Sequence, residues 1–207
     1  MAKVLRKRCD VVFKKRFGIE TPIQYLEDVK IDPKVSDRFK RSWKRFLPKA
    51  KPIISEYRGE RLDAFFRQLE IDGTDERYCR RVTIRYISPK VGYGVFATED
   101  IPPYSTLHHY TGLLMLDDEI DPDHDSTFSF SDYKNYSIDA MKHGNWTRFM
   151  NHGDPTKGAT NAIPWEHYID EGPRVVFTTG RYGVKKGEQI LYSYGDEYWA
   201  ERDFVSL

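Results

Sequence analysis

The nine residues Gly187-Glu188-Gln189-Ile190-Leu191-Tyr192-Ser193-Tyr194-Gly195 decide how the rest of this chain is interpreted. Side chains alternate between the two faces of a β-strand, so Ile190, Tyr192 and Tyr194 are expected on one face. Two neighbouring phenols form an apolar wall with polar tips, which suits a long side chain that ends in an amine. Taken alone, the stretch favours a core strand that has a tyrosine rim, and the rest of the chain reverses this preference.

The composition indicates a globular protein of one domain with an addition, or of two small domains. The 207 residues are 31% charged and 14% aromatic, and the mean hydropathy is −0.68. No apolar run reaches membrane-spanning length, and the first residues lack the apolar core of a signal peptide. We therefore expect no membrane contact and an intracellular protein, nuclear or cytoplasmic, or one exported to a host cell if its source is bacterial. Cys9 and Cys79 form neither a disulfide framework nor a cysteine zinc site, which favours a reducing compartment.

Charge is divided unevenly along the chain. Residues 1–52 contain 16 Lys and Arg against 6 Asp and Glu, although the whole chain has a formal net charge of only +1. The basic N-terminal part predicts contact with nucleic acid or nucleoprotein, and the acidic remainder predicts attraction to basic peptides. A solvated basic face is the alternative for the N-terminal clusters.

Helical periodicity is strongest in the N-terminal part. Residues 34–47 place apolar side chains at helical spacing opposite a face of Lys and Arg: Val35, Phe39, Trp43, Phe46 and Leu47. Pro48 is expected to end this helix, and a second amphipathic helix is predicted over residues 60–70. The basic helix is either a packing helix with a solvated side or a binding helix.

From residue 81 onward the apolar period becomes that of strands. Alternation predicts a strand that begins at Val82, and the following strands are predicted over residues 106–116, 136–138, 174–178 and 189–194. The stretch Gly92-Tyr93-Gly94-Val95-Phe96-Ala97 has the letters of a dinucleotide fingerprint, but Pro102-Pro103 follows where that motif needs a helix. We therefore expect its backbone to approach a ligand or a neighbouring segment closely.

Residues 117–125 are dominated by carboxylates. This segment lacks the glycine and the regular ligand spacing of a calcium loop. It is either a solvated acidic loop or a rim that attracts a lysine-rich peptide. No metal site is predicted, because no two of the six histidines have the spacing of a zinc protease motif.

Four stretches, in this order, resemble the SET-domain protein lysine methyltransferases. They are Gly92-x-Gly94-Val95-Phe96-Ala97; Tyr110-x-Gly112; Ile138-Asp139-Ala140 with Gly144-Asn145 and Arg148-Phe149-x-Asn151-His152; and Gly187-Glu188-x-Ile190-x-Tyr192-x-Tyr194-Gly195. The resemblance implies a β-rich SET fold, with several small sheets and a knot-like C-terminal crossing. The helical periodicity before residue 80 predicts that a mostly helical N-terminal region precedes it. We expect a basic, mostly helical region over residues 1–78, a SET-like methyltransferase domain over 79–199 and a C-terminal tail over 200–207.

The resemblance also implies S-adenosyl-L-methionine as the cofactor. The backbone of Gly92-Tyr93-Gly94 would cradle the methionine part of this molecule. Arg148 would lie in the crossing beside Asn151 and His152, which would hydrogen-bond the cofactor. Trp199 would close over the adenine.

The tyrosines would form the catalytic part of the site. The resemblance makes Tyr194 the catalytic tyrosine, places Tyr110 in the lysine channel, and puts Tyr192 where the family has Tyr or Phe. A Tyr at 192 leaves less room than a Phe, so we expect mainly one methyl to be added. The chain departs from the family at Gly153-Asp154-Pro155, where Ser and Cys are usual, and it lacks flanking cysteine-rich zinc segments.

These observations predict methyl transfer to the ε-amine of a lysine in a basic protein, such as a histone or a histone-like protein. One alternative is a catalytically weak or inactive SET-like module that binds basic peptides or nucleoprotein through the basic N-terminal region. A second alternative is a nucleic-acid-binding protein led by residues 1–52, and this reading is compatible with the enzyme.

Overall fold

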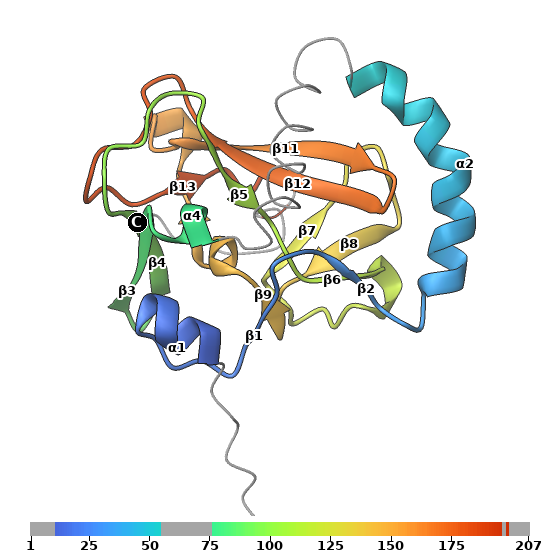
Figure 1. Cartoon of the computed structure of the whole chain (residues 1–207), viewed down its shortest axis with the longest axis horizontal. Helices are drawn as coiled ribbons and strands as arrows, with labels where there is room; N and C mark the ends of the chain where they lie inside the picture. The colour runs from blue at the N-terminus through green and yellow to red at the C-terminus, as the bar shows by residue number, and fades with distance from the viewer. Residues whose placement is uncertain (1–10, 55–75, 196–197, 199–207) are drawn as a thin grey trace, which may run out of the picture.

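The computed structural model describes residues 11–54, 76–195 and 198 of the chain. Within these residues, short strands form five sheets of two to four strands, and the longest helix lies along one side (Figure 1). The α-helices are α1 (Val11–Phe17), α2 (Ser36–Ile54) and α4 (Glu76–Cys79). The 3₁₀-helices are η1 (Asp117–Glu119), η2 (Trp146–Phe149) and η3 (Pro155–Lys157). The strands are β1 (Gln24–Tyr25), β2 (Lys30–Ile31), β3 (Val82–Ser88), β4 (Gly92–Ala97), β5 (Thr106–His109), β6 (Leu113–Leu116), β7 (Thr127–Ser129), β8 (Tyr136–Asp139), β9 (His143–Gly144), β10 (Asn151–His152), β11 (Ala162–Ile169), β12 (Gly172–Thr179) and β13 (Leu191–Tyr192).

The sheets join segments that are distant in the sequence. The largest has the strand order β2-β6-β8-β7, and a second has the order β11-β12-β5. The strands β3 and β4 form an antiparallel hairpin, whereas β1–β9 and β10–β13 are short parallel pairs. The several small sheets predicted from the sequence are confirmed.

The part of the N-terminal region that the structure describes combines two helices with two short strands. The strand β1 pairs with β9, and β2 pairs with β6, so the segment between α1 and α2 belongs to the sheets of the core. The helical content of this region is therefore modest. The helix predicted over residues 60–70 lies outside the described residues, and the predicted domain boundaries remain a prediction.

The helix α2 continues beyond the residue at which it was expected to end. It runs to Ile54, so the predicted end at Pro48 is wrong. Pro48 is exposed, which leaves the carbonyl group four residues before it accessible to water. The apolar face meanwhile continues to the buried Ala50, and the packing of this face outweighs the local cost of the proline.

Aromatic side chains fix α2 to the rest of the molecule. Phe39 and Trp43 are 2% and 4% exposed, and both make edge contacts with Tyr133. The Trp43 indole N–H donates to the carbonyl oxygens of Ile169 and Asp170, at 3.1 Å each, in the turn between β11 and β12. The predicted apolar face of this helix is therefore a packing face.

Two strand predictions need correction. Residues 106–116 are not one strand, because β5 and β6 belong to different sheets and residues 110–112 separate them. The Thr111 hydroxyl donates to the Leu26 carbonyl at 3.0 Å, which anchors this break to the N-terminal segment.

The strand β11 was not predicted from the sequence, and it contains Pro164. It lies at the edge of its sheet, where proline is tolerated. Of the strand predicted over residues 189–194, only Leu191–Tyr192 is a strand.

Among the described helices, none combines the length and the apolar character that a membrane-crossing segment needs. Within the same residues, no three His, Cys, Asp or Glu side chains come together as metal ligands. His108 and His109 are almost fully buried and stack on each other, with ring centroids 4.8 Å apart.

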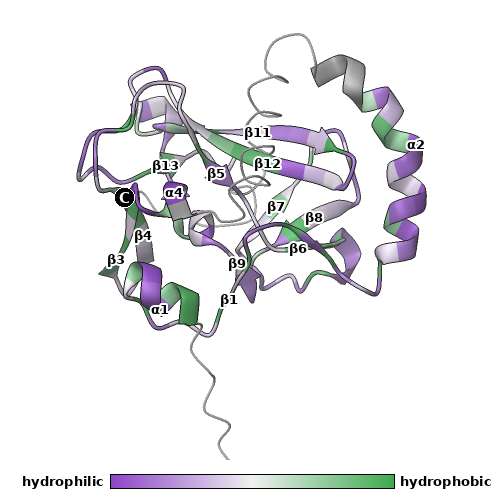
Figure 2. Ribbon diagram, viewed as in Figure 1, coloured by the Kyte–Doolittle hydropathy of each residue, from purple (hydrophilic) through white to green (hydrophobic). Residues whose placement is uncertain are grey.

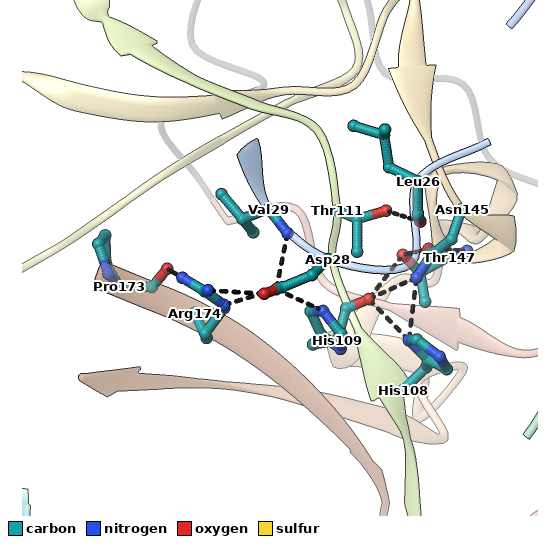
Figure 3. Close-up of polar contacts among 10 residues, drawn as sticks. All are labelled: Leu26, Asp28, Val29, His108, His109, Thr111, Asn145, Thr147, Pro173 and Arg174. Atoms are coloured by element: carbon teal, nitrogen blue, oxygen red, sulfur yellow. Dashed lines mark hydrogen bonds and ion pairs between the residues drawn. The ribbon is translucent and has the colours of Figure 1, made fainter. Parts of the chain in front are cut away.

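A polar network joins the segment before β2 to β5 and β12 (Figure 3). The Asp28 carboxylate accepts a hydrogen bond from a terminal nitrogen of Arg174 at 2.8 Å and forms an ion pair with Arg174 Nε at 2.7 Å. It also contacts His109 Nε2 at 3.0 Å. Burial alone would raise the pKa of Asp28, but the hydrogen bonds and charges of His109 and Arg174 lower it well below its ordinary value of 3.8. The ionised form of Asp28 therefore stabilises the fold.

We predict that Asp28→Asn lowers the free energy of unfolding at neutral pH by about 1–2 kcal/mol, because the half-exposed charge pair with Arg174 is partly screened by water. A carboxyl group whose folded pKa is depressed contributes stability above its unfolded pKa and loses it as the pH falls through the folded value. The difference between wild type and variant should therefore shrink as the pH falls below 3.8.

Urea unfolding of both proteins over a series of pH values measures this difference. The matched control is Asp118→Asn, which removes an exposed carboxylate and should change stability by less than about 0.5 kcal/mol. A difference for Asp28→Asn that stays constant down to about pH 2 would contradict the role of its charge.

Candidate active site

A cavity of about 1050 Å³ lies between β4, β7, η2, β10 and the residues that follow β13. Six of the predicted site residues line it: Tyr93, Tyr110, Arg148, Asn151, Tyr192 and Tyr194. Gly92, Gly94 and His152 are neighbours of lining residues in the chain but are not themselves part of the wall. Trp199 lies outside the described residues. The structure thus brings six of the predicted site residues together at one cavity.

The parallel pairing of β10 with β13 brings the two halves of the site together. Asn151 pairs with Leu191, and His152 pairs with Tyr192. The backbone N–H of Tyr194 donates to His152 Nδ1 at 3.1 Å, so the neutral imidazole has its proton on Nε2. Burial lowers the pKa of His152, which favours this neutral form. The histidine therefore holds the tyrosine segment in place.

The glycine at 153 explains one departure from the family pattern. A Cβ atom at this position would lie 2.6 Å from the carbonyl oxygen of Ala159 and 2.9 Å from the Cβ of Leu191. Both neighbours are fixed parts of the chain, so a Ser at 153 would push the Ala159 backbone away from β13. Gly153 thus permits tight packing directly after β10.

The Tyr194 phenol is oriented by hydrogen bonding and by neighbouring rings. Its hydroxyl donates to the Met150 carbonyl at 2.9 Å. Its ring centroid lies 4.8 Å from those of Tyr192 and Tyr198. Burial raises the pKa of Tyr194 well above the ordinary value of 10, and the nearby Tyr110 adds to this shift. The phenol therefore stays protonated and is a poor general base.

Tyr110 and Tyr192 complete the aromatic wall. The Tyr110 hydroxyl donates to the Ser126 carbonyl at 2.9 Å, whereas within the described residues the Tyr192 hydroxyl has no hydrogen-bond partner. The Tyr192 ring packs against Phe177 at a centroid distance of 4.8 Å and stacks on Phe128. Burial raises the pKa of both phenols well above 10. All three tyrosines thus present neutral phenols.

Arg148 bridges two segments of the wall. Its Nε donates to the Ala140 carbonyl at 2.7 Å, and one terminal nitrogen donates to Ser126 Oγ at 2.9 Å. The Ser126 carbonyl accepts from Tyr110 and from the Ala140 backbone N–H, so Ser126 is held on three sides. Burial lowers the pKa of Arg148, and the nearby Tyr110, Asp125 and Asp139 oppose this shift.

The sequence predicts that the backbone of Gly92-Tyr93-Gly94 approaches a ligand or a neighbouring segment closely. At Gly94 the structure shows such an approach, to the side chains of Gln189 and Asn151. A Cβ atom at Gly94 would lie 2.6 Å from Gln189 Nε2 and 3.1 Å from Asn151 Nδ2. The Asn151 amide in turn donates to the Tyr93 carbonyl at 3.0 Å. Gly92 differs, because its φ is +76° and a Cβ atom there would meet nothing within 4 Å. Open space therefore remains beside the backbone at Gly92.

Several lining residues were not predicted as site residues. Phe128 and Glu166 come from β7 and β11, and Asp125 is the only residue of the acidic segment 117–125 that lines the cavity. Other members of that segment have structural partners; for example, Asp117 accepts from the Ser137 hydroxyl at 2.7 Å. The acidic composition of residues 117–125 could have indicated Asp125 as a site residue. The sequence around Phe128 and Glu166 contains no comparable indication.

The family model described as SET domain matches residues 92–195, half of the chain. This span contains every lining residue of the cavity except Val91 and Tyr198. The chain belongs to the SET-domain family. The family and the β-rich SET fold predicted from the sequence are thereby confirmed.

Curated relatives of this SET-domain chain are larger proteins. Histone-lysine N-methyltransferase EHMT1 from Homo sapiens is 31% identical over 118 residues, which are 55% of this chain and 9% of EHMT1. Histone-lysine N-methyltransferase EZH2 from Chaetomium thermophilum is 31% identical over 120 residues, which are 52% of this chain and 8% of EZH2. This chain therefore spans less than a tenth of the length of either relative.

Among solved structures, ctPRC2 in an autoinhibited conformation bound to S-adenosylmethionine is 28% identical, with a TM-score of 0.48. The match covers 56% of this chain and 15% of that chain.

Proposed function

We propose that this SET-domain chain is a protein lysine methyltransferase that uses S-adenosyl-L-methionine. The observation that carries the proposal is the convergence of Tyr110, Tyr192 and Tyr194 with Asn151 on one cavity. The matched relatives support it, since EHMT1 and EZH2 are both named histone-lysine N-methyltransferases. The match to the SET-domain family supports the choice of cofactor, because the resemblance to this family implies S-adenosyl-L-methionine.

The residues of the cavity fit this cofactor. A volume of about 1050 Å³ is sufficient for a drug-sized ligand together with an incoming side chain. The Asn151 side chain in the wall offers a donor and an acceptor, and the open backbone at Gly92 and the neutral imidazole of His152 lie beside lining residues in the chain. We assign these groups to cofactor binding, together with Tyr93 and Gly94. Cofactor contacts of Arg148 and Trp199 remain predictions, and the two hydrogen bonds of Arg148 support an additional role in holding the wall.

When bound, the cofactor supplies a methyl group on a positively charged sulfur. In the transfer, the bond between sulfur and methyl breaks as the bond between methyl and the lysine nitrogen forms. The protein must bring the three atoms into line, and positioning of this kind can contribute roughly 7–11 kcal/mol to lowering a barrier. The fixed rings of Tyr110, Tyr192 and Tyr194 provide this alignment in our proposal.

The lysine amine must arrive without its proton, although its reference pKa is ~10.4. An aromatic, poorly hydrated channel disfavours the charged ammonium form, and a nearby positive charge disfavours it further. The protonated state of Tyr194 argues against proton abstraction by this residue. We infer that the proton leaves to solvent before methyl transfer and that Tyr194 orients the neutral amine.

The substrate that we propose is a lysine in a basic protein, such as a histone-like protein. Asp125 places a carboxylate in the cavity wall, and the preceding residues 117–119 are exposed and acidic. Carboxylates at the rim attract Lys- and Arg-rich segments and speed their association. A chromatin substrate would also be consistent with a nuclear location, which is one of the locations expected from the sequence.

The function is tested by incubating the protein with labelled S-adenosyl-L-methionine and an array of basic peptides. We predict that Tyr194→Phe lowers methyl transfer by about a hundredfold, because it removes the hydroxyl that Met150 orients. Cofactor affinity, measured by calorimetry, should be retained because the aromatic ring stays. Tyr182→Phe is the control, because Tyr182 is 77% exposed and distant from the cavity wall.

An unchanged turnover in Tyr194→Phe would contradict the assigned role of this tyrosine. A wild-type protein without affinity for the cofactor would contradict the enzyme assignment itself.

The size of residue 192 should set the number of methyl groups added. We predict that wild-type protein yields mainly monomethyl-lysine and that Tyr192→Phe raises the dimethyl product, because the free hydroxyl occupies space that a methylated amine requires. Mass spectrometry of one peptide over a time course measures the distribution. A trimethyl product from the wild-type protein would disprove this prediction.

The Asp125 carboxylate in the cavity wall should contribute to a preference for basic peptides. We predict that Asp125→Asn raises KM for Lys- and Arg-rich peptides about two- to fivefold, the size expected for a partly exposed charge contact. Asp118→Asn removes the same charge from the same segment but away from the cavity, so it should leave KM unchanged. Equal effects of the two substitutions would show that net charge, rather than the position of Asp125, is responsible.

A further inference from the structure

The outward side of α2 and the turn just before it carry exposed basic residues. There are seven, and we call them the basic face: Lys34, which precedes the helix, and Arg38, Lys40, Arg41, Lys44, Arg45 and Lys49 on it. The only acidic residue between positions 34 and 49 is Asp37. Figure 2 shows hydrophilic residues recurring along this helix, which stands at one side of the molecule.

The basic face contains a continuous row of like charges. Arg38, Arg41, Arg45 and Lys49 are spaced three, four and four positions apart, so that each lies next to the following one on the helix surface. At 1.5 Å per residue this row is roughly 16 Å long. Like charges at this spacing oppose helix formation, so the sequence maintains the row at a cost in stability.

In the part of the chain that the structure describes, the basic face has no acidic partner. Among the described residues, none of its seven side chains forms an ion pair. Other basic residues do, for example Arg81 with Glu99 at 3.1 Å and Lys185 with Asp100 at 3.2 Å. An exposed surface that serves only solubility usually mixes both signs of charge. The basic face therefore has the character of a surface that meets an external polyanion.

The opposite side of α2 is already occupied. Val35, Phe39 and Trp43 are 1%, 2% and 4% exposed, and they pack on the body of the protein. A helix that binds a membrane surface inserts its apolar face into the lipid, and α2 has no such face to spare. This observation disfavours a membrane as the polyanion.

We propose that the basic face binds the phosphate backbone of double-stranded nucleic acid without reading the base sequence. Duplexes present closely spaced phosphates, and Lys and Arg neutralise them with release of counterions. The face contains no exposed aromatic residue on which unpaired bases would stack, which favours a duplex over a single strand. It also contains no Asn or Gln that would read base edges, which makes sequence-independent binding the expected mode.

The basic face and the methyltransferase cavity can be used together. The helix α2 stands at the side of the molecule opposite the β3–β4 hairpin, whose strand β4 contributes Tyr93 to the cavity (Figure 1). A nucleoprotein would meet these two surfaces with its duplex and with a basic protein segment, respectively. Duplex binding itself does not depend on the proposed enzyme activity.

The test is fluorescence anisotropy of the full chain with a labelled DNA duplex of about two helical turns. The variant Arg38→Gln/Arg41→Gln/Arg45→Gln should weaken binding roughly tenfold or more at ~0.1 M salt. It should also reduce the slope of log affinity against log salt by roughly 2–3, since each phosphate contact contributes ~0.9. Lys90→Gln/Lys142→Gln/Arg181→Gln removes the same charge from other exposed positions and should bind within about twofold of wild type. Circular dichroism of both variants checks that they fold.

Three results would overturn the proposal. One is equal weakening by the two triple variants, which would assign binding to net charge alone. Another is a wild-type affinity that does not change with salt. The third is binding to phosphatidylserine vesicles in preference to the duplex, which would identify a membrane as the partner.

Discussion

The pairing of β10 with β13 is the constraint on which the candidate site depends. Two residue pairs join Asn151 and His152 to Leu191 and Tyr192, and the Gly153 N–H adds a bond to the Tyr192 carbonyl at 3.0 Å. These contacts are made largely by backbone groups, so the path of the chain at this point depends little on which side chains it carries. The functional side chains then project from a crossing whose geometry is already set.

Burial determines the chemistry of this crossing. It holds Tyr110, Tyr192 and Tyr194 in the protonated form and keeps His152 neutral. A wall of neutral phenols can donate hydrogen bonds and exclude water, but it offers little capacity for proton abstraction at ordinary pH. The site is thus better suited to orienting reactants than to acid–base catalysis, which agrees with a reaction governed by alignment.

The sequence predicted the parts of the structure that depend on local backbone requirements. The motif around Asn151 and the tyrosine pair were informative because the family uses specific residue types where chain segments cross. Long-range packing decided the rest. The apolar face of α2 carried the helix through Pro48, an edge position accommodated Pro164 in β11, and only Asp125 of the acidic segment turned toward the cavity. The direction of a side chain in an irregular loop depends on partners elsewhere, and a single sequence does not contain them.

Because the chain is synthesised from its N-terminus, the pairing of β10 with β13 forms late. Four of the five described sheets are built entirely from residues up to Thr179, whereas β13 follows twelve positions later, at Leu191. Most of the scaffold can thus assemble on the ribosome before the segment with the last two site tyrosines emerges. A nascent polypeptide completes this cavity only at this late stage, so translation products that end before Tyr192 would lack the candidate site.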